Sequence, residues 1–167
     1  AATRPPVQLY AMTAAHILQL ARAQNLHIAT AESCTGGLVA AALTEIPGSS
    51  DVFDRGFVTY SNAAKIDMLG VSPLTLAQHG AVSEAIAAEM ATGALGHSAA
   101  QLAVAITGIA GPGGSEFKPE GRVCFGLART GQPPQTQTIE FGPLGRSIVR
   151  SKARDHALAL LLAALAR

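Results

Sequence analysis

The sequence predicts an α/β protein with three layers, α/β/α, and a mixed, mostly parallel five-stranded sheet in which one strand is antiparallel. Short apolar segments alternate with helical periods along most of the chain, which is typical of parallel strands covered on both faces. The last two strand-like segments are separated only by residues 130–134 (TGQPP), a link short enough to require a hairpin. The 167 residues, 49% apolar and 14% charged, suit one domain with a substantial core and exclude intrinsic disorder.

The expected strands are short runs rich in apolar or β-branched residues, bounded by turn residues. They cover residues 26–31, 56–60, 102–106, 122–128 and 136–141. The expected helices follow a 3.6-residue apolar period or a helix start signal, such as Ser83 followed by Glu84. They cover residues 9–24, 38–45, 63–69, 83–94 and 146–166, with a further short helix starting at Ser72-Pro73. We expect one stand-alone domain over residues 1–167, with residues 1–8 as a flexible lead-in.

Charge and composition narrow the range of partners. Lys and Arg number 12 against 11 Asp and Glu, and no basic stripe indicates nucleic-acid binding. The longest strongly apolar stretch, 157–166, falls well short of the roughly 20 residues of a membrane span. Two cysteines without a signal-peptide pattern favour the cytoplasm. No CxxC or HExxH motif occurs, so no metal site is expected.

Three segments follow the parallel strands at the edge where open α/β sheets bind ligands. They are residues 31–37 (AESCTGG), 60–65 (YSNAAK) and 107–114 (TGIAGPGG). In the first, Ser33 stands between a strand and a helix, where backbone N–H groups can stabilise an oxyanion. A helix N-cap at Ser33 or Thr35 is the alternative. Cys34 is a second candidate nucleophile, although a small buried cysteine is the more common role.

The other two segments offer a base and an anion site. Lys65 falls one turn into its helix, where a desolvated lysine can serve as a base; a solvated surface lysine is the alternative. Tyr60 lies just before that helix. The Gly-rich segment matches neither a P-loop nor GxGxxG, and it suits a phosphate or carboxamide cradle or a plain loop. Arg146 and Arg150 open the last helix, where an unfavourable helix dipole suggests a role such as phosphate binding; two plain surface arginines are the alternative.

Taken together, these segments closely resemble the CinA C-terminal domain family, the nicotinamide mononucleotide amidases. The matching stretches are Ala31–Gly37, Pro47–Ser50, Gly56–Asn62 with Lys65, His79–Ser83, Thr107–Pro112, Lys118-Pro119 and Gly121. Several motifs in the same order make the resemblance specific, and it runs from about residue 9 to the C-terminus.

The resemblance implies hydrolysis of nicotinamide mononucleotide to nicotinate mononucleotide and ammonia, without a metal or other cofactor. It implies Ser33 as nucleophile, Lys65 as its base and Tyr60 as a hydroxyl that assists proton transfer. Ser50, Thr107 and Arg146 match the remaining site positions, and either Arg146 or Arg150 would hold the 5′-phosphate. We also expect substrate contacts from the turn after Ser33 and from the Gly-rich segment. These are Thr35, Gly36, Gly108, Gly111 and Gly113.

The family resemblance also implies a homo-oligomer, a dimer or larger, in which a neighbouring subunit can contribute to the site. Two other functions stay open. An inactive nucleotide-binding or regulatory module would keep the pocket without turnover. A cysteine hydrolase would depend on Cys34 and not on Ser33.

Overall fold

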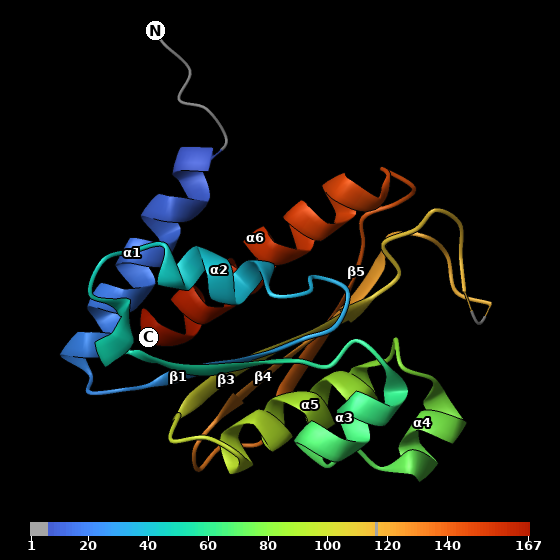
Figure 1. The fold of residues 1–167 in the computed structure, drawn as a ribbon, viewed down its shortest axis with the longest axis horizontal. Helices are drawn as coiled ribbons and strands as arrows, with labels where there is room; N and C mark the ends of the chain where they lie inside the picture. Colours follow the sequence, from blue (N-terminus) through green and yellow to red (C-terminus); the bar gives the residue numbers. More distant parts are fainter. Residues whose placement is uncertain (1–6, 116) are drawn as a thin grey trace, which may run out of the picture.

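The described residues form one five-stranded sheet in the order β2-β1-β3-β4-β5 (Figure 1). The computed structural model describes residues 7–115 and 117–167. The strands are β1 (Ile28–Glu32), β2 (Phe53–Val58), β3 (Leu102–Gly108), β4 (Arg122–Arg129) and β5 (Gln135–Glu140). β1 pairs in parallel with β2 and β3, whereas β4 is antiparallel to both β3 and β5. One strand therefore opposes the other four, which confirms the predicted mixed sheet.

Helices cover both faces of the sheet, which confirms the three layers (Figure 1). One face carries α1 (Val7–Ala23), α2 (Leu38–Thr44) and α6 (Arg146–Leu165), and the other carries α3 (Asn62–Leu69), α4 (Pro73–His79) and α5 (Glu84–Gly96). A short 3₁₀ turn, η1 (Ser49–Asp51), precedes β2. Alternate residues of β1 enter opposite cores: Ile28 packs with the first group, and Ala29 with the second.

Most predicted elements lie within two residues of the observed ones. One start signal and one end signal are confirmed: the Ser83 hydroxyl accepts a hydrogen bond from the Ile86 N–H at 3.2 Å, and Gly70 ends α3 with φ +68°. The largest shift is at β2, which lies at 53–58 and not at 56–60. This edge strand contains Asp54 and Arg55, so its first half lacks the apolar pattern used for prediction.

The first helix also differs from its prediction. α1 begins at Val7, two residues before the predicted Leu9, so Val7 and Gln8 are helical and not part of a lead-in. The remaining residues of the expected lead-in, 1–6, lie outside the described residues. A helix start is hard to fix from sequence because its first N–H groups have no partner within the helix.

Close helix packing fixes the position of α3, which carries Lys65. A Cβ at Gly93 in α5 would lie only 2.0 Å from the Leu69 carbonyl oxygen at the end of α3. Only glycine allows the two helices to approach this closely. α3 is thereby held against the edge where β1, β2 and β3 end.

Among the described helices, none is both long and apolar enough to cross a membrane.

Candidate active site

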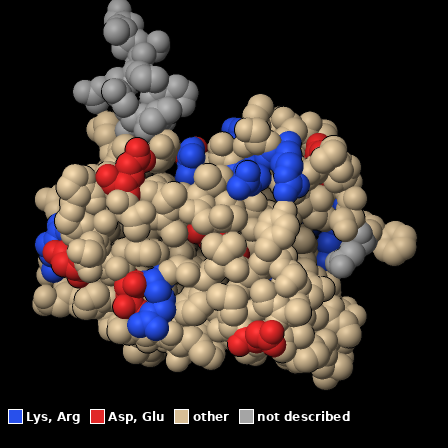
Figure 2. Space-filling view, viewed as in Figure 1, with Lys and Arg blue, Asp and Glu red and all other residues tan. Residues whose placement is uncertain are grey.

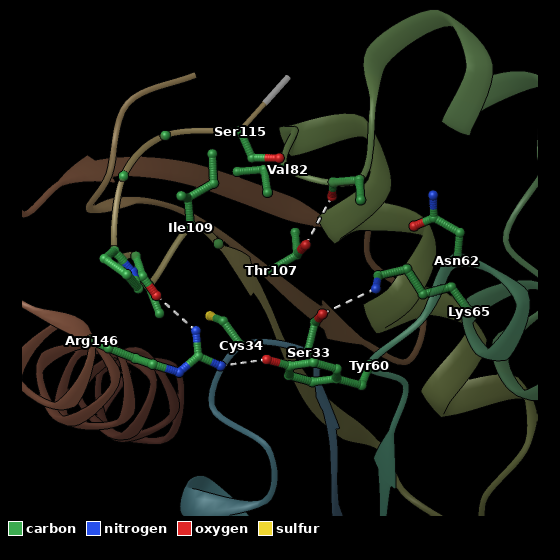
Figure 3. A pocket seen from close by; sticks show the side chains of 17 residues that line it. Ser33, Cys34, Tyr60, Asn62, Lys65, Val82, Thr107, Ile109, Ser115 and Arg146 are labelled. Carbon is green, nitrogen blue, oxygen red and sulfur yellow. Dashed lines mark hydrogen bonds between the residues drawn. The ribbon is translucent and has the colours of Figure 1, made fainter. Parts of the chain in front are cut away.

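A pocket of about 350 Å³ opens where β1 and β3 end (Figure 3). Its floor is formed by residues that follow β1, and its walls by the β2–α3 loop, the α4–α5 loop, the Gly-rich segment and the start of α6. The lining residues are Ser33, Cys34, Tyr60, Asn62, Lys65, Ala81, Val82, Thr107, Gly108, Ile109, Ala110, Gly111, Pro112, Gly113, Gly114, Ser115 and Arg146. The three segments singled out in the sequence thus meet at one site.

Lys65 and Ser33 are in direct contact in this pocket (Figure 3). The Lys65 Nζ donates to Ser33 Oγ at 3.0 Å and to the Thr59 carbonyl at 2.9 Å. Lys65 is only 1% exposed, and burial lowers the pKa of its ammonium group. No acidic side chain forms an ion pair with it within the described parts of the chain. The alternative of a solvated surface lysine is wrong.

Local sequence explains how Lys65 reaches Ser33. The Ser61 hydroxyl accepts a hydrogen bond from the Ala64 N–H at 3.0 Å and so starts α3 at Asn62. Lys65 therefore lies one turn into the helix, and its long side chain extends back over the end of β1. The Thr59 carbonyl at the end of β2 holds the amine in that direction.

The turn after Ser33 is capped by a residue that the sequence did not reveal. The buried carboxylate of Glu32 accepts hydrogen bonds from the N–H groups of Val39 and Ala40, at 2.9 and 3.0 Å. The N-cap interpretation of Ser33 or Thr35 is therefore wrong: Ser33 Oγ contacts Lys65, and no partner is recorded for Thr35 Oγ1 among the described residues. A capping side chain six residues before the start of the helix has no sequence signature.

The same contacts limit which backbone N–H groups could meet an oxyanion. Those of Val39 and Ala40 are occupied by Glu32, and that of Gly36 donates to the Ser33 carbonyl at 3.0 Å. The Cys34 N–H comes first after Ser33, and no main-chain acceptor for it is recorded within the described residues. Of the residues that follow Ser33 in this turn, Cys34 is the one among the described lining residues, so its N–H is the candidate donor to an oxyanion.

Cys34 itself does not resemble an activated nucleophile. Burial raises the pKa of its thiol to about 12, so the thiol stays protonated near neutral pH. No histidine is among the described lining residues. His27 precedes β1 and so lies at the opposite end of that strand from Cys34. The geometry therefore does not favour a cysteine hydrolase.

Arg146 and Tyr60 meet at the mouth of the pocket (Figure 3). One guanidinium nitrogen of Arg146 donates to the Tyr60 hydroxyl at 2.5 Å, and another donates to the Gly111 carbonyl at 2.8 Å. Both side chains are exposed, as expected of groups that can reach a substrate. The Tyr60 hydroxyl contacts Arg146, and no contact of it with Lys65 or Ser33 is recorded.

Arg150 is not brought into the pocket. Its Nε donates to the Cys34 carbonyl at 3.0 Å, and its terminal nitrogen to the Thr35 carbonyl at 3.3 Å. Thr35 and Gly36 belong to the same turn and do not line the pocket either. Of the two candidate arginines, the structure thus brings only Arg146 to the site. Arg150 lies one helical turn further along α6, where its guanidinium meets the backbone of the turn after Ser33.

Ser50 lies at the opposite end of the strands from the pocket. It is an exposed residue of η1, directly before β2, whereas the pocket lies where the parallel strands end. The structure of one chain does not bring Ser50 to Ser33. Ser50 precedes β2, whereas the three segments that meet in the pocket follow strands, so its place in the chain already puts it at the opposite end of the strands.

The remaining predicted residues do line the pocket. Thr107 is buried and donates from its hydroxyl to the Ala81 carbonyl at 2.8 Å, while Gly108, Gly111 and Gly113 form the adjacent wall. The sequence had not singled out Asn62, Val82, Ile109 or Ser115 as lining residues. Asn62 is a polar residue of the matching stretch Gly56–Asn62, and Ser115 directly follows the Gly-rich segment 107–114; these positions were the only available signal.

No group of three or more His, Cys, Asp or Glu side chains in the described residues is arranged to hold a metal ion. None of the described lining residues is acidic. Figure 2 shows Lys and Arg side chains gathered over α6, with acidic side chains elsewhere on this face. Among the described lining residues, Lys65 and Arg146 are basic. The pocket therefore suits an anionic ligand.

Known proteins resemble this chain over nearly all of its length. The family model of the CinA C-terminal domain matches residues 11–165. The nicotinamide-nucleotide amidohydrolase PncC of Escherichia coli K12 is 49% identical over 158 residues, which cover 90% of this chain and 95% of that protein. A CinA-like protein of Chloroherpeton thalassium is 60% identical over 114 residues, 68% of this chain.

The match to the CinA-like proteins covers only part of them. The chain spans 27% of the Chloroherpeton thalassium protein and 34% of a putative competence-damage inducible protein of Symbiobacterium thermophilum. Among solved structures, the competence/damage inducible protein CihA of Agrobacterium tumefaciens is 46% identical, with a TM-score of 0.91 over the whole of both chains. A CinA superfamily protein of Klebsiella pneumoniae is 39% identical, with a TM-score of 0.90 over 94% of this chain and 98% of that one.

Proposed function

The chain belongs to the CinA C-terminal domain family, and from this premise we propose that it hydrolyses the carboxamide of nicotinamide mononucleotide to nicotinate mononucleotide and ammonia. The observation that carries the proposal is the buried contact of 3.0 Å between Lys65 Nζ and Ser33 Oγ. The similarity to PncC of Escherichia coli, which covers 95% of that protein, supports the choice of substrate.

The proposed first step is attack by Ser33. Lys65 must be neutral to act as a base, and its burial without an acidic partner lowers its pKa in that direction. With one N–H donated to the Thr59 carbonyl, the lone pair of the neutral amine faces Ser33. Lys65 takes the hydroxyl proton as Ser33 Oγ bonds to the carboxamide carbon, and the carbonyl electron pair moves onto its oxygen. The Cys34 N–H is the proposed donor to that oxyanion.

The proposed second step expels ammonia. The oxyanion reforms the carbonyl, the C–N bond breaks, and Lys65 passes its proton to the departing nitrogen. Ser33 is left as an ester of the nicotinate group. In the second half of the reaction, water attacks this ester, Lys65 takes a proton from the water, and that proton returns to Ser33 Oγ as the acid leaves.

We assign substrate binding to residues at the mouth and in one wall of the pocket. Arg146 is exposed beside the pocket on a basic helix, and its planar guanidinium has donors left to bind a phosphate. Thr107, Gly108, Gly111 and Gly113 form the wall against which the nucleotide would lie. Tyr60 is assigned to the site as the hydroxyl that Arg146 holds.

We propose further that the protein forms a homo-oligomer and acts in the cytoplasm, with a small nucleotide as its partner and without nucleic acid or membrane. Light scattering of the purified protein tests the oligomer. A dimer in which Ser50 of one subunit reaches Ser33 of the next would give Ser50 the role that a single chain does not provide.

The decisive experiment is ammonia release from nicotinamide mononucleotide, with free nicotinamide as the control substrate. Wild type and Lys152→Met, which removes an exposed lysine of α6, should release ammonia from the mononucleotide only. Ser33→Ala and Lys65→Met should not release it. Binding of the mononucleotide by folded wild type without ammonia release would reject the amidase and support the nucleotide-binding module.

A further inference from the structure

The turn from Ser33 to Gly37 is held from two sides by groups that do not touch the pocket. Glu32 binds the N–H groups at the start of α2, and Arg150 binds the carbonyls of Cys34 and Thr35. Both carbonyls belong to the residues that immediately follow Ser33. The Arg150 contacts therefore act on the backbone directly after the proposed nucleophile.

The two hydrogen bonds of Arg150 fix the orientation of two consecutive peptide planes, Cys34–Thr35 and Thr35–Gly36. In a trans peptide the carbonyl and the next N–H point in opposite directions. Because the Cys34 carbonyl faces Arg150, the Thr35 N–H must face away from α6. The Thr35 carbonyl accepts from Arg150 and also from the Leu38 N–H at 3.0 Å, so the same guanidinium connects the turn to α2.

Gly36 provides independent support for this arrangement. It has φ +57°, and a Cβ at this position would lie 3.2 Å from the terminal nitrogen of Arg150. The turn thus leaves space for the guanidinium, which packs directly against its backbone. The absence of a side chain at Gly36 is therefore consistent with a structural contact between Arg150 and the turn.

We propose that Arg150 is a positioning residue, which holds the backbone after Ser33 so that the nucleophile and the Cys34 N–H are oriented before substrate binds. This inference rests on the proposed amidase function. It gives Arg150 a role other than phosphate binding, since both of its recorded partners are main-chain carbonyls. Two of the arginines of α6 thereby have different roles: Arg146 would bind the substrate, and Arg150 holds the turn.

The test compares Arg150→Met, Arg150→Lys and the control Lys152→Met in steady-state kinetics on nicotinamide mononucleotide. Arg150→Met should lower kcat by about 100-fold, the size of effect expected when a reacting group is displaced by about 1 Å, while KM changes by less than about threefold. Arg150→Lys should recover little of this loss, because a lysine ammonium lacks the planar fork that reaches two carbonyls. Lys152→Met should match wild type.

Amide hydrogen exchange provides a readout that does not need turnover. Residues 34–38 should exchange faster in Arg150→Met and Arg150→Lys than in wild type, with the core of the sheet unchanged. If Arg150→Met fails to fold, Arg150→Lys still provides both measurements. A wild type that releases no ammonia would overturn the amidase, and the exchange data would still decide whether Arg150 orders the turn.

Three results would overturn the positioning role. A raised KM with unchanged kcat would assign Arg150 to substrate binding. Full activity of Arg150→Lys would show that only its charge matters. Unchanged exchange at residues 34–38 in both variants would show that Arg150 does not order the turn.

Discussion

Arg146 donates a hydrogen bond to the Tyr60 hydroxyl and so joins the start of α6 to the loop between β2 and α3. The same guanidinium holds the Gly111 carbonyl, so it connects three segments around the mouth of the pocket. A phosphate bound to Arg146 would lie beside the Tyr60 hydroxyl. The Arg146–Tyr60 pair therefore couples phosphate binding to the arrangement of the residues around the mouth of the pocket.

Arg146→Gln should weaken binding of the mononucleotide more than it slows the chemistry. A hydrogen bond to a charged group contributes about 1.5–3 kcal/mol, so KM should rise by roughly 10- to 150-fold. Nicotinamide riboside, which lacks the phosphate, should be hydrolysed equally well by wild type and variant. An equal loss of kcat/KM on both substrates would contradict a phosphate contact. Tyr60→Phe provides a companion measurement, with a smaller rise in KM because its hydroxyl is neutral.

The pH dependence of kcat/KM should report the proton of Lys65. The neutral amine is the base, so the rate should increase with pH and level off once Lys65 is deprotonated. Burial lowers the pKa of Lys65, and the midpoint should therefore lie below the ordinary lysine value of about 10.4. If kcat/KM instead decreased as pH rises through the neutral range, the pH dependence would have the opposite sign, and Lys65 would be excluded as the base.

Lys65→Met should be inactive yet at least as stable as wild type. The substitution keeps an unbranched side chain and removes the cost of burying an amine that has no acidic partner. We expect the free energy of unfolding to rise by about 1 kcal/mol near neutral pH, as is common when a site residue is replaced for stability. Urea unfolding measures this change. A loss of more than about 2 kcal/mol, the size of a lost buried contact, would show that Lys65 stabilises the fold.

Hydroxylamine should intercept the reaction after ammonia has left. If Ser33 carries the nicotinate group as an ester, hydroxylamine competes with water for it and yields the hydroxamate of the mononucleotide. Mass spectrometry should detect this product with wild type and not with Ser33→Ala. Direct attack of water on the carboxamide, without an ester on Ser33, would produce no enzyme-dependent hydroxamate.

Glu32→Gln should destabilise the fold, because a glutamine oxygen can replace only one of the two carboxylate acceptors. Leaving one buried N–H without a partner costs about 1–3 kcal/mol. Glu140→Gln is the matched control: its exposed ion pair with Arg122 should change stability by less than about 1 kcal/mol. Similar unfolding curves for the two variants would mean that Glu32 is not needed to cap α2.

The types of the sheet elements could be predicted from the sequence, because apolar runs and turn residues are local patterns. Ser33 and Lys65 were expected after neighbouring parallel strands, and the structure brings the two side chains into contact. The roles of Arg146 and Arg150 could not be separated in this way. They are identical side chains one helical turn apart, and only packing decides which of them faces the pocket. Ser50 also could not be assigned to the site of one chain: it belongs to a matching stretch, but it lies at the opposite end of the strands from the pocket. Glu32 was missed because its partners are seven and eight residues away.

The reversed direction of β4 has a consequence for how pockets of this kind can diversify. β3 ends and β4 begins at the same end of the sheet, so the two ends of the loop that contains the Gly-rich segment lie side by side. The Gly121 N–H donates a hydrogen bond to the Ile109 carbonyl at 2.7 Å and closes the loop. Ser33 and Lys65 are carried by other elements. Insertions or deletions between residues 110 and 120 would therefore reshape one wall of the pocket and leave the reacting groups in place. New substrates are thus accessible through changes in a single hairpin loop.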